Sequence, residues 1–209
     1  MRRGLFITFE GIDGCGKSTQ IEIFKGLLDA KNIPYLALRE PGGTRISESI
    51  RNILLDAHNA EMADQTEVLL FAAARAQLVS ERILPALNSG ICVLCDRYID
   101  SSIAYQAYGR ELGEEFIKSA NSFSMANCMP DRTLFFNVSP LDVKTRLEGR
   151  GSSDRMESEK TVFHERVFHG YLSLLRQYPE RIISIDASKS IEQVSKEVKS
   201  AAKDIFQKW

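Results

Sequence analysis

A nine-residue segment near the start of the chain constrains the fold more than any other feature. Residues 11–19 read Gly-Ile-Asp-Gly-Cys-Gly-Lys-Ser-Thr and satisfy the pattern G-x-x-x-x-G-K-[ST]. An apolar run at 5–10 predicts a strand before the segment, and Ile21, Phe24 and Leu28 recur at helical spacing after it. A glycine-rich turn between a strand and a helix is the context in which this pattern forms a phosphate-binding loop, or P-loop.

This loop predicts a binding site for a nucleoside triphosphate. Its backbone N–H groups and the positive end of the following helix stabilise phosphate oxygens. Lys17 is expected to reach the β and γ phosphates, and the Ser18 hydroxyl is expected to bind Mg²⁺. The residues expected to bind the nucleotide are Gly11, Ile12, Asp13, Gly14, Cys15, Gly16, Lys17, Ser18 and Thr19.

Five short apolar runs alternate with longer helical patterns along the 209 residues. Their ranges are 5–10, 35–39, 91–96, 133–138 and 182–186. Alternation with helices implies parallel pairing, and strands that are apolar throughout imply helices on both faces of the sheet. We therefore expect an α/β fold, a doubly wound five-stranded parallel sheet flanked by helices, of the P-loop nucleoside triphosphate hydrolase type. Because no linker separates two folding units, residues 1–209 are predicted to form one domain.

Composition limits the partners and the compartment. A formal net charge of −1 gives no general attraction to nucleic acid. No segment approaches the ~20 apolar residues of a membrane span. The apolar run that follows Arg2 and Arg3 is too short for a signal peptide. We therefore expect a cytoplasmic protein with no nucleic-acid or membrane partner.

Cysteine and histidine patterns predict neither a metal centre nor a hydrolase. Cys92 and Cys95 have C-x-x-C spacing, but side chains three apart in a strand point to opposite faces, which predicts buried structural thiols. His164 and His169 are five apart, and no H-E-x-x-H motif is present. The G-x-S-x-G turn that carries the nucleophile of many serine hydrolases is also absent from the sequence.

Polar residues follow three of the predicted strands and are expected to meet beside the P-loop. The carboxyl ends of neighbouring strands in an open α/β sheet face one crevice, so Asp13, Glu40 and the pair Asp96-Arg97 should converge. Asp96 is placed to hold Mg²⁺ directly or through water, and Arg97 to clamp an acceptor phosphate bidentately. A Ras-type GTPase is disfavoured, because residues 96–99 lack the glycine of D-x-x-G and no N-K-x-D is present.

Further motifs narrow the comparison to one family. Arg-Glu-Pro-Gly-Gly-Thr at 39–44, Asp-Arg-Tyr at 96–98 and Ser-Ile-Ala-Tyr-Gln at 102–106 occur in this order. With them the chain resembles the thymidylate kinases over nearly its whole length. The resemblance implies ATP and Mg²⁺ as donor and cofactor, and thymidine monophosphate (dTMP) as the acceptor, whose diphosphate product supplies dTTP for DNA synthesis. It also implies a homodimer.

The resemblance assigns residues to the acceptor. They are Asp13, Glu40, Pro41, Arg51, Phe71, Arg75, Arg97, Ser102, Tyr105 and Gln106. Asp13 would contact the acceptor sugar, and Arg51 would help to hold the monophosphate. Phe71 and Arg75 lie one helical turn apart, so the ring could stack on the base while the guanidinium donates to its carbonyl. Such donation favours thymine O4 over the amino group of cytosine, because two facing donors leave one unpaired.

A polar, charge-dense segment at about 146–160 resembles a lid. Some thymidylate kinases carry an arginine in the P-loop after the acid, but this sequence has Gly14 there, so the resemblance implies a lid arginine to stabilise the moving phosphoryl group. Arg150 is the first candidate, Arg146 and Arg155 remain open, and a solvated charged loop is the alternative. The predicted catalytic residues are Lys17, Arg97, Asp13 and Arg150.

Two other functions stay open at this level. A kinase for another nucleoside monophosphate or for a deoxynucleoside would use the same loop and lid, and acceptor profiling would separate it. A regulatory P-loop ATPase would bind ATP without turnover on any acceptor, because the loop alone does not define an activity. The acceptor residues argue against this second alternative.

Overall fold

The computed structural model describes residues 2–147 and 154–209. The strands in these ranges are β1 (Phe6–Glu10), β2 (Tyr35–Arg39), β3 (Cys92–Asp96), β4 (Arg132–Asn137) and β5 (Ile182–Asp186). The α-helices are α1 (Lys17–Asp29), α2 (Arg45–Leu55), α3 (Asp64–Leu78), α4 (Leu84–Asn88), α5 (Ile99–Ser102), α6 (Glu114–Ala120), α7 (Ser122–Asn127), α8 (Pro140–Leu147), α9 (Thr161–Gln177) and α10 (Ile191–Lys208). Two π-helical segments, η1 (Val79–Ile83) and η2 (Ile103–Gly109), directly follow α3 and α5.

The strands form one parallel sheet in the order β2-β3-β1-β4-β5. The predicted runs at 35–39 and 182–186 coincide with β2 and β5. The runs at 5–10 and 91–96 begin one residue before β1 and β3, and the run at 133–138 is shifted by one residue from β4. Every residue of the central strand β1 is buried, as expected for a strand covered on both faces. The predicted doubly wound α/β fold is confirmed.

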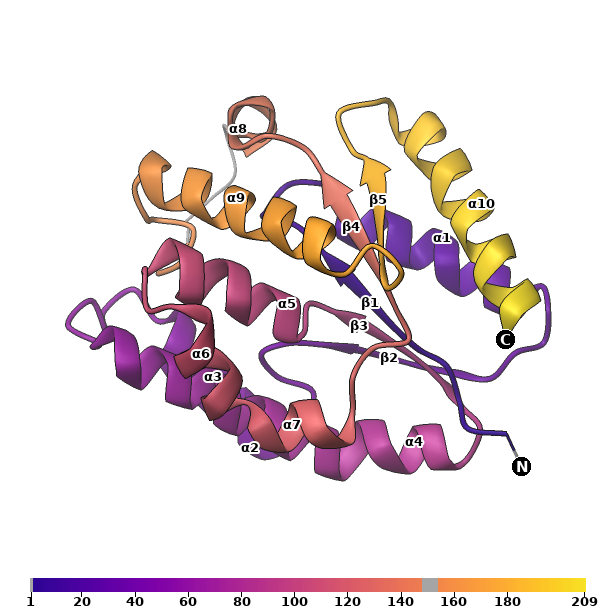
Figure 1. Cartoon of the computed structure of the whole chain (residues 1–209), viewed down its shortest axis with the longest axis horizontal. Helices are drawn as coiled ribbons and strands as arrows, with labels where there is room; N and C mark the ends of the chain where they lie inside the picture. Colours follow the sequence, from indigo (N-terminus) through magenta and orange to yellow (C-terminus); the bar gives the residue numbers. More distant parts are fainter. Residues whose placement is uncertain (1, 148–153) are drawn as a thin grey trace.

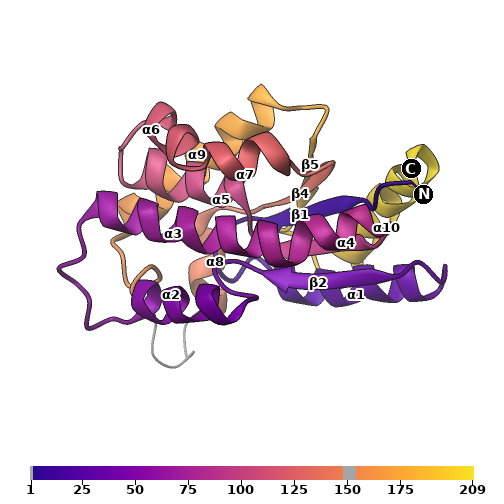
Figure 2. The same ribbon diagram turned by 90° about the horizontal axis from the view of Figure 1, so that it is seen from below.

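Helices cover both faces of the sheet. α1 and α10 pack against each other on one face, and α4, α5 and α9 lie on the other (Figure 1). Figure 2 shows the strands between these two layers, with α2 and α3 adjacent at one end. Aromatic pairs tie both layers to the strands: Phe9 of β1 meets Phe24 of α1 at 5.5 Å, and Phe135 of β4 stacks on Tyr171 of α9 at 5.1 Å, between ring centroids.

The thiols of β3 lie inside the sheet. Cys92 and Cys95 are both buried, and burial raises the pKa of Cys92 to about 12. The prediction of buried structural thiols is confirmed. Within the described ranges no helix combines the length and the apolar character needed to cross a membrane.

Two wide helical turns were not predicted from periodicity. The apolar stripe at 68–87 is divided among α3, η1 and α4 instead of following one helix. Pro85 explains the break, because it has no N–H to donate and its ring crowds the preceding turn. In η2 the pattern widens again, and the Arg110 N–H donates to the Tyr105 carbonyl five residues back at 3.0 Å. Such π-helical turns occur frequently at functional sites.

Candidate functional site

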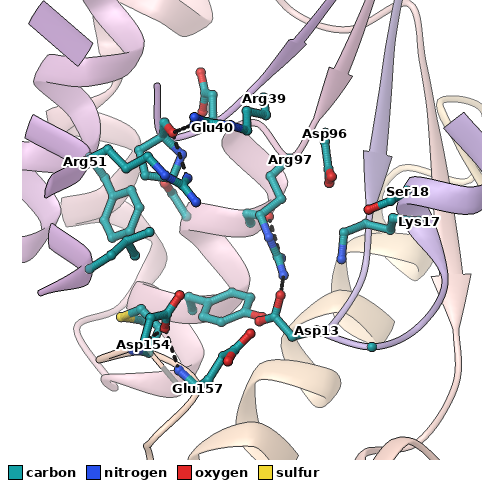
Figure 3. Close-up of a pocket in the computed structure, with 18 of the residues that line it drawn as sticks. Asp13, Lys17, Ser18, Arg39, Glu40, Arg51, Asp96, Arg97, Asp154 and Glu157 are labelled. Carbon is teal, nitrogen blue, oxygen red and sulfur yellow. Dashed lines mark hydrogen bonds and ion pairs between the residues drawn. The ribbon is translucent and has the colours of Figure 1, made fainter. Parts of the chain in front are cut away.

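A cavity of about 320 Å³ opens at the carboxyl ends of β1, β2 and β3 (Figure 3). It is lined by most of the predicted site residues, namely Asp13, Gly14, Gly16, Lys17, Ser18, Thr19, Glu40, Pro41, Arg51, Phe71, Arg75, Asp96, Arg97, Ser102, Tyr105 and Gln106. Gly11, Ile12 and Cys15 are buried residues of the P-loop outside this lining. Arg150 lies outside the described residues. The topology therefore brings the predicted nucleotide and acceptor residues into one cleft.

The backbone shapes the P-loop for an anion. Gly16 has a left-handed φ of +95° and directly precedes Lys17, the first residue of α1. A Cβ on Gly11 would lie 2.9 Å from the Cys15 Sγ and 3.0 Å from the Phe136 carbonyl oxygen, so glycine is needed for this close approach. No side chain of the described residues caps the start of α1. Its first N–H groups therefore remain available to phosphate oxygens.

The Lys17 ammonium is held over the same loop. Its Nζ donates to the carbonyl oxygens of Gly11 at 3.0 Å and Ile12 at 3.1 Å. Only 7% of the residue is exposed, and that part lines the cavity. A buried cation at the mouth of a phosphate cradle exerts a stronger field than the same cation in water.

Asp96 offers an anionic oxygen without a partner. It ends β3 beside the P-loop, and its Oδ1 is buried and accepts no hydrogen bond from any described residue. A buried carboxylate oxygen in this condition is costly unless a cation satisfies it. The Ser18 hydroxyl lines the same cavity, and Figure 3 shows both side chains on its P-loop side. Oxygen ligands of this kind suit Mg²⁺, so the residues present fit the metal.

Arg97 joins the end of β3 to the P-loop. Its φ of +68° is left-handed, which is uncommon for a residue with a long side chain. Nη2 donates to the Asp13 Oδ1 at 2.6 Å, and Nη1 donates to the Gly11 carbonyl oxygen at 2.9 Å. The guanidinium also lies over the Tyr105 ring, 5.1 Å from its centroid. Strained backbone of this kind persists only where surrounding contacts fix it, as these do.

Asp13 is ionised in this setting. Burial raises the pKa of its carboxyl, but the Arg97 guanidinium and the Lys17 ammonium outweigh burial and hold the pKa well below its usual range. The Tyr105 hydroxyl donates to the Asp13 Oδ2 at 3.2 Å. A carboxylate without a proton only accepts hydrogen bonds. Asp13 can therefore accept a hydrogen bond from a hydroxyl group but cannot donate one.

Glu10 holds the groups that surround Arg97, and the sequence did not predict this role. Its Oε1 accepts the Tyr98 N–H at 2.7 Å, which fixes the backbone just after Arg97. Its Oε2 accepts the hydroxyls of Ser101 at 2.5 Å and Tyr171 at 3.1 Å. Both hydroxyls accept from the Arg97 Nη1 at 3.3 Å. The only sequence signal was an acidic residue ending an otherwise apolar strand.

The Glu10 carboxyl should make stability depend on pH. Burial raises its pKa from 4.5 to about 7, and the neighbouring Asp100 adds to the rise. The folded state then holds the proton more tightly than the unfolded state, so the stabilising contribution is full below pH 4.5 and is lost as pH rises through 7. The free energy of unfolding of the wild type should therefore fall by about 3 kcal/mol between these pH values. We expect Glu10→Gln to remove this fall, measured by chemical denaturation at a series of pH values. Parallel pH profiles for both proteins would contradict this.

Residues predicted to bind a base line the other end of the cavity. Arg75 is 2% exposed and donates to Glu40 Oε2 at 2.8 Å, to Ser102 Oγ at 2.9 Å and to Asn121 Oδ1 at 2.6 Å. It also donates to the Tyr98 carbonyl oxygen at 3.1 Å. A base carbonyl would therefore have to share an Arg75 N–H group with one of these acceptors or displace that acceptor. The sequence did not indicate that Arg75 already has these partners.

Glu40 and Arg51, both predicted to bind the acceptor, differ in how far they are free to contact it. Burial raises the pKa of Glu40, and the Arg75 guanidinium beside it opposes the rise. Its Oε1 is buried and has no partner among the described residues. The Arg51 Nη1 donates to the Pro41 carbonyl oxygen at 2.9 Å, and Figure 3 shows the guanidinium directed into the cavity. Arg51 is thus placed where an anionic group of an acceptor could lie.

Residues 154–160, the described end of the predicted lid segment, pack against the cavity. Arg155 is 8% exposed, and its Nε donates to the Leu54 carbonyl oxygen at 2.8 Å while its Nη2 pairs with Glu67 at 2.6 Å. These contacts indicate an anchor for the segment. Asp154 and Glu157 also line the cavity, although they belong to no sequence motif that predicts a site. The Arg146 side chain lies outside the described residues, as Arg150 does.

Comparison with known proteins gives one consistent result. A family model described as thymidylate kinase matches residues 9–198. A protein named thymidylate kinase from Exiguobacterium sp. strain AT1b is 47% identical over 195 residues, which cover 93% of this chain and 92% of the relative. Proteins of the same name from Caldanaerobacter subterraneus subsp. tengcongensis and Bacillus velezensis are 46% and 45% identical, with at least 91% of each chain covered.

Proposed function

The chain belongs to the thymidylate kinase family and transfers a phosphoryl group from ATP to dTMP, and we propose that the described cleft performs this transfer. The observation that carries the proposal is the contact between Arg97 and Asp13, which joins the acceptor side of the cleft to the P-loop at 2.6 Å. Residues 1–209 act as one kinase domain, in which the segment 146–160 serves as a lid. Phosphoryl transfer depends mainly on positioning and electrostatics, which a cleft of this kind provides.

Different residues of the cleft bind the phosphates of ATP and the phosphate of dTMP. The P-loop N–H groups and Lys17 hold the ATP phosphates. Arg97, with Arg51, holds the dTMP phosphate, and Asp13 accepts a hydroxyl of the sugar. Ser18 and the unpartnered Asp96 Oδ1 hold Mg²⁺, which supplies positive charge to the phosphate oxygens when bound. This division places the acceptor phosphate beside the γ phosphate.

The base is selected at the opposite end of the cavity. Phe71 stacks on the thymine ring, while Arg75, Ser102 and Gln106 offer polar contacts. Arg75 donates to the base carbonyl by sharing the hydrogen bonds it makes in this structure. Its ion pair with Glu40, 2.6 Å long, fixes the plane of the guanidinium for that contact.

An acceptor panel tests the proposed site. We measure ADP formation from Mg²⁺-ATP with dTMP, dUMP, dCMP, AMP, GMP and thymidine supplied one at a time. dTMP should give the highest kcat/KM, and Phe71→Ala should lower that value by about 10- to 100-fold through the loss of stacking on the base. If Phe71→Ala leaves kcat/KM for dTMP unchanged, the assignment of Phe71 to base binding is wrong. Turnover independent of any acceptor would favour a regulatory ATPase.

The lid arginine has its own test. Arg150→Ala should lower kcat by about 10²- to 10³-fold with a much smaller change in KM, because the lost charge acts mainly on the moving phosphoryl group. Lys160→Ala removes an exposed cation from the same segment and serves as the matched control. Equal effects of both substitutions would indicate a general electrostatic role of the segment instead of a specific one.

A homodimer in the cytoplasm completes the proposal. Exposed apolar side chains occur on the neighbouring helices α3, α6 and α7, where Leu69, Phe116 and Phe123 are 56%, 37% and 48% exposed. Apolar side chains gathered on adjoining helices are typical of a surface that another chain covers. Light scattering after size exclusion measures the mass directly, and a value of one chain at micromolar concentration would contradict the dimer.

A further inference from the structure

The buried carboxylate of Glu67 lies outside the predicted site but contacts Gln106, a residue of the cavity end that is proposed to bind the nucleobase. We propose that Glu67 is a positioning residue that fixes the orientation of the Gln106 carboxamide and thereby sets the preference of the site for bases with an N3–H. The inference rests on the proposed function, in which Gln106 contacts the base. It adds a specificity-determining residue that itself has no place in the cavity lining.

Glu67 is completely buried on α3 and lies at the centre of a charged cluster. The Gln106 Nε2 donates to its Oε1 at 2.9 Å. The Nη2 atoms of Arg110 and Arg155 approach its Oε2 at 3.0 Å and 2.6 Å. Arg110 also pairs with Glu159, near the end of the lid segment 146–160. The cluster therefore connects α3, the end of η2 and the carboxyl-terminal end of the lid segment.

The charge of Glu67 determines which end of the Gln106 amide faces it. Burial raises the pKa of Glu67, but the hydrogen bonds and charge of Arg110, together with Gln106 and Arg155, lower it below the usual value. An ionised carboxylate can only accept hydrogen bonds, so the Gln106 NH₂ group must face it. The orientation of the amide then follows from chemistry, although the two ends of a carboxamide have nearly the same shape.

The opposite end of the amide is left for a ligand. Gln106 lines the cavity, and no described residue donates a hydrogen bond to its Oε1. A fixed acceptor matches the N3–H of thymine or uracil. Cytosine presents a lone pair at N3, so two acceptors would face each other in a buried site. A mismatch of this kind reduces kcat/KM by about 10- to 100-fold, since a buried unpaired polar group costs about 1–3 kcal/mol.

A purely structural role for Glu67 is the competing explanation, because the same carboxylate anchors Arg155. The test compares Glu67→Gln with Glu159→Gln in the full-length chain. Both variants replace one carboxylate that pairs with Arg110, but only Glu67 contacts Gln106. A glutamine at position 67 can either donate or accept, so it no longer dictates the orientation of the Gln106 amide.

The readout is the ratio of kcat/KM values for pairs of acceptors, with thermal unfolding measured in parallel. In Glu67→Gln the dTMP:dCMP ratio should fall at least 10-fold, while the dTMP:dUMP ratio should stay within about twofold, since both bases carry an N3–H. Glu159→Gln should keep both ratios. A loss of stability without a change in the dTMP:dCMP ratio would overturn the inference, as would equal losses in both ratios.

A double-mutant cycle identifies the route of the effect. Gln106→Ala removes the acceptor, so adding Glu67→Gln should change the dTMP:dCMP ratio no further. Multiplying effects would show that Glu67 acts by another route. If Glu67→Gln does not fold, Glu67→Asp keeps the charge for the arginines, withdraws the carboxylate from Gln106, and should lower the same ratio. A wild-type chain without preference for dTMP over dCMP would instead contradict the proposed base site itself.

Discussion

Replacement of Arg97 by asparagine is expected to lower kcat/KM for dTMP by about 10³-fold. The guanidinium is the group that can hold the acceptor phosphate bidentately, and its loss also frees Asp13 from the contact at 2.6 Å. The choice of asparagine follows from the φ of +68°, because asparagine adopts left-handed backbone more readily than other residues with a Cβ. Activity and backbone strain can therefore be separated at this position.

Arg97→Ala is the matched comparison. Alanine removes the same guanidinium but keeps the strain, so both variants should lose activity equally, while the asparagine variant should be more stable by about 1 kcal/mol. Steady-state kinetics and chemical denaturation measure the two quantities independently. A fully active asparagine variant would mean that Arg97 does not contact the acceptor, and equal stabilities would mean that the strain at this residue is relieved elsewhere.

Replacement of Lys17 by methionine should also lower kcat by about 10³-fold. Methionine keeps most of the side-chain length but removes the ammonium that donates to the Gly11 and Ile12 carbonyl oxygens and that would reach the ATP phosphates. The effect should fall mainly on kcat, since charge on the γ phosphate matters most in the transition state.

Lys25→Met provides the control on the same helix. Lys25 pairs with Glu22 at 2.6 Å on the exposed side of α1, so its loss should change kcat less than threefold. Single-turnover measurements at saturating ATP separate the chemical step from binding. If Lys17→Met mainly weakens ATP binding and leaves the single-turnover rate intact, Lys17 contributes uniform binding instead of transition-state stabilisation.

The fold and the cleft could be predicted because their signals are local. Strand runs, glycines and the order of motifs lie within short windows of sequence, and the parallel topology then forces the strand ends together. The P-loop and Asp96 illustrate this: each follows a predicted strand, and both line the cavity.

The acidic supports could not be predicted because their partners are distant in sequence. Glu10 is bound by residues about 90 and 160 positions away, and Glu67 by residues about 40 and 90 positions away. Periodicity shows that a position faces inward, but it does not show which arginine will meet a carboxylate there. For the same reason Arg155 could not be separated in advance from a catalytic lid arginine.

The wide turn η2 contributes to the end of the cavity that is proposed to bind the base. The geometry there depends on how many residues η2 contains, and not only on which residues they are. A π-helical turn contains more residues than an α-helical turn. Deleting one residue between 103 and 109 would close this stretch into a regular α-helix. Each side chain after the deletion would then rotate by about 100° around the helix axis. Arg110 would leave Glu67, so a shortened chain could stay folded and still lose its selectivity between bases.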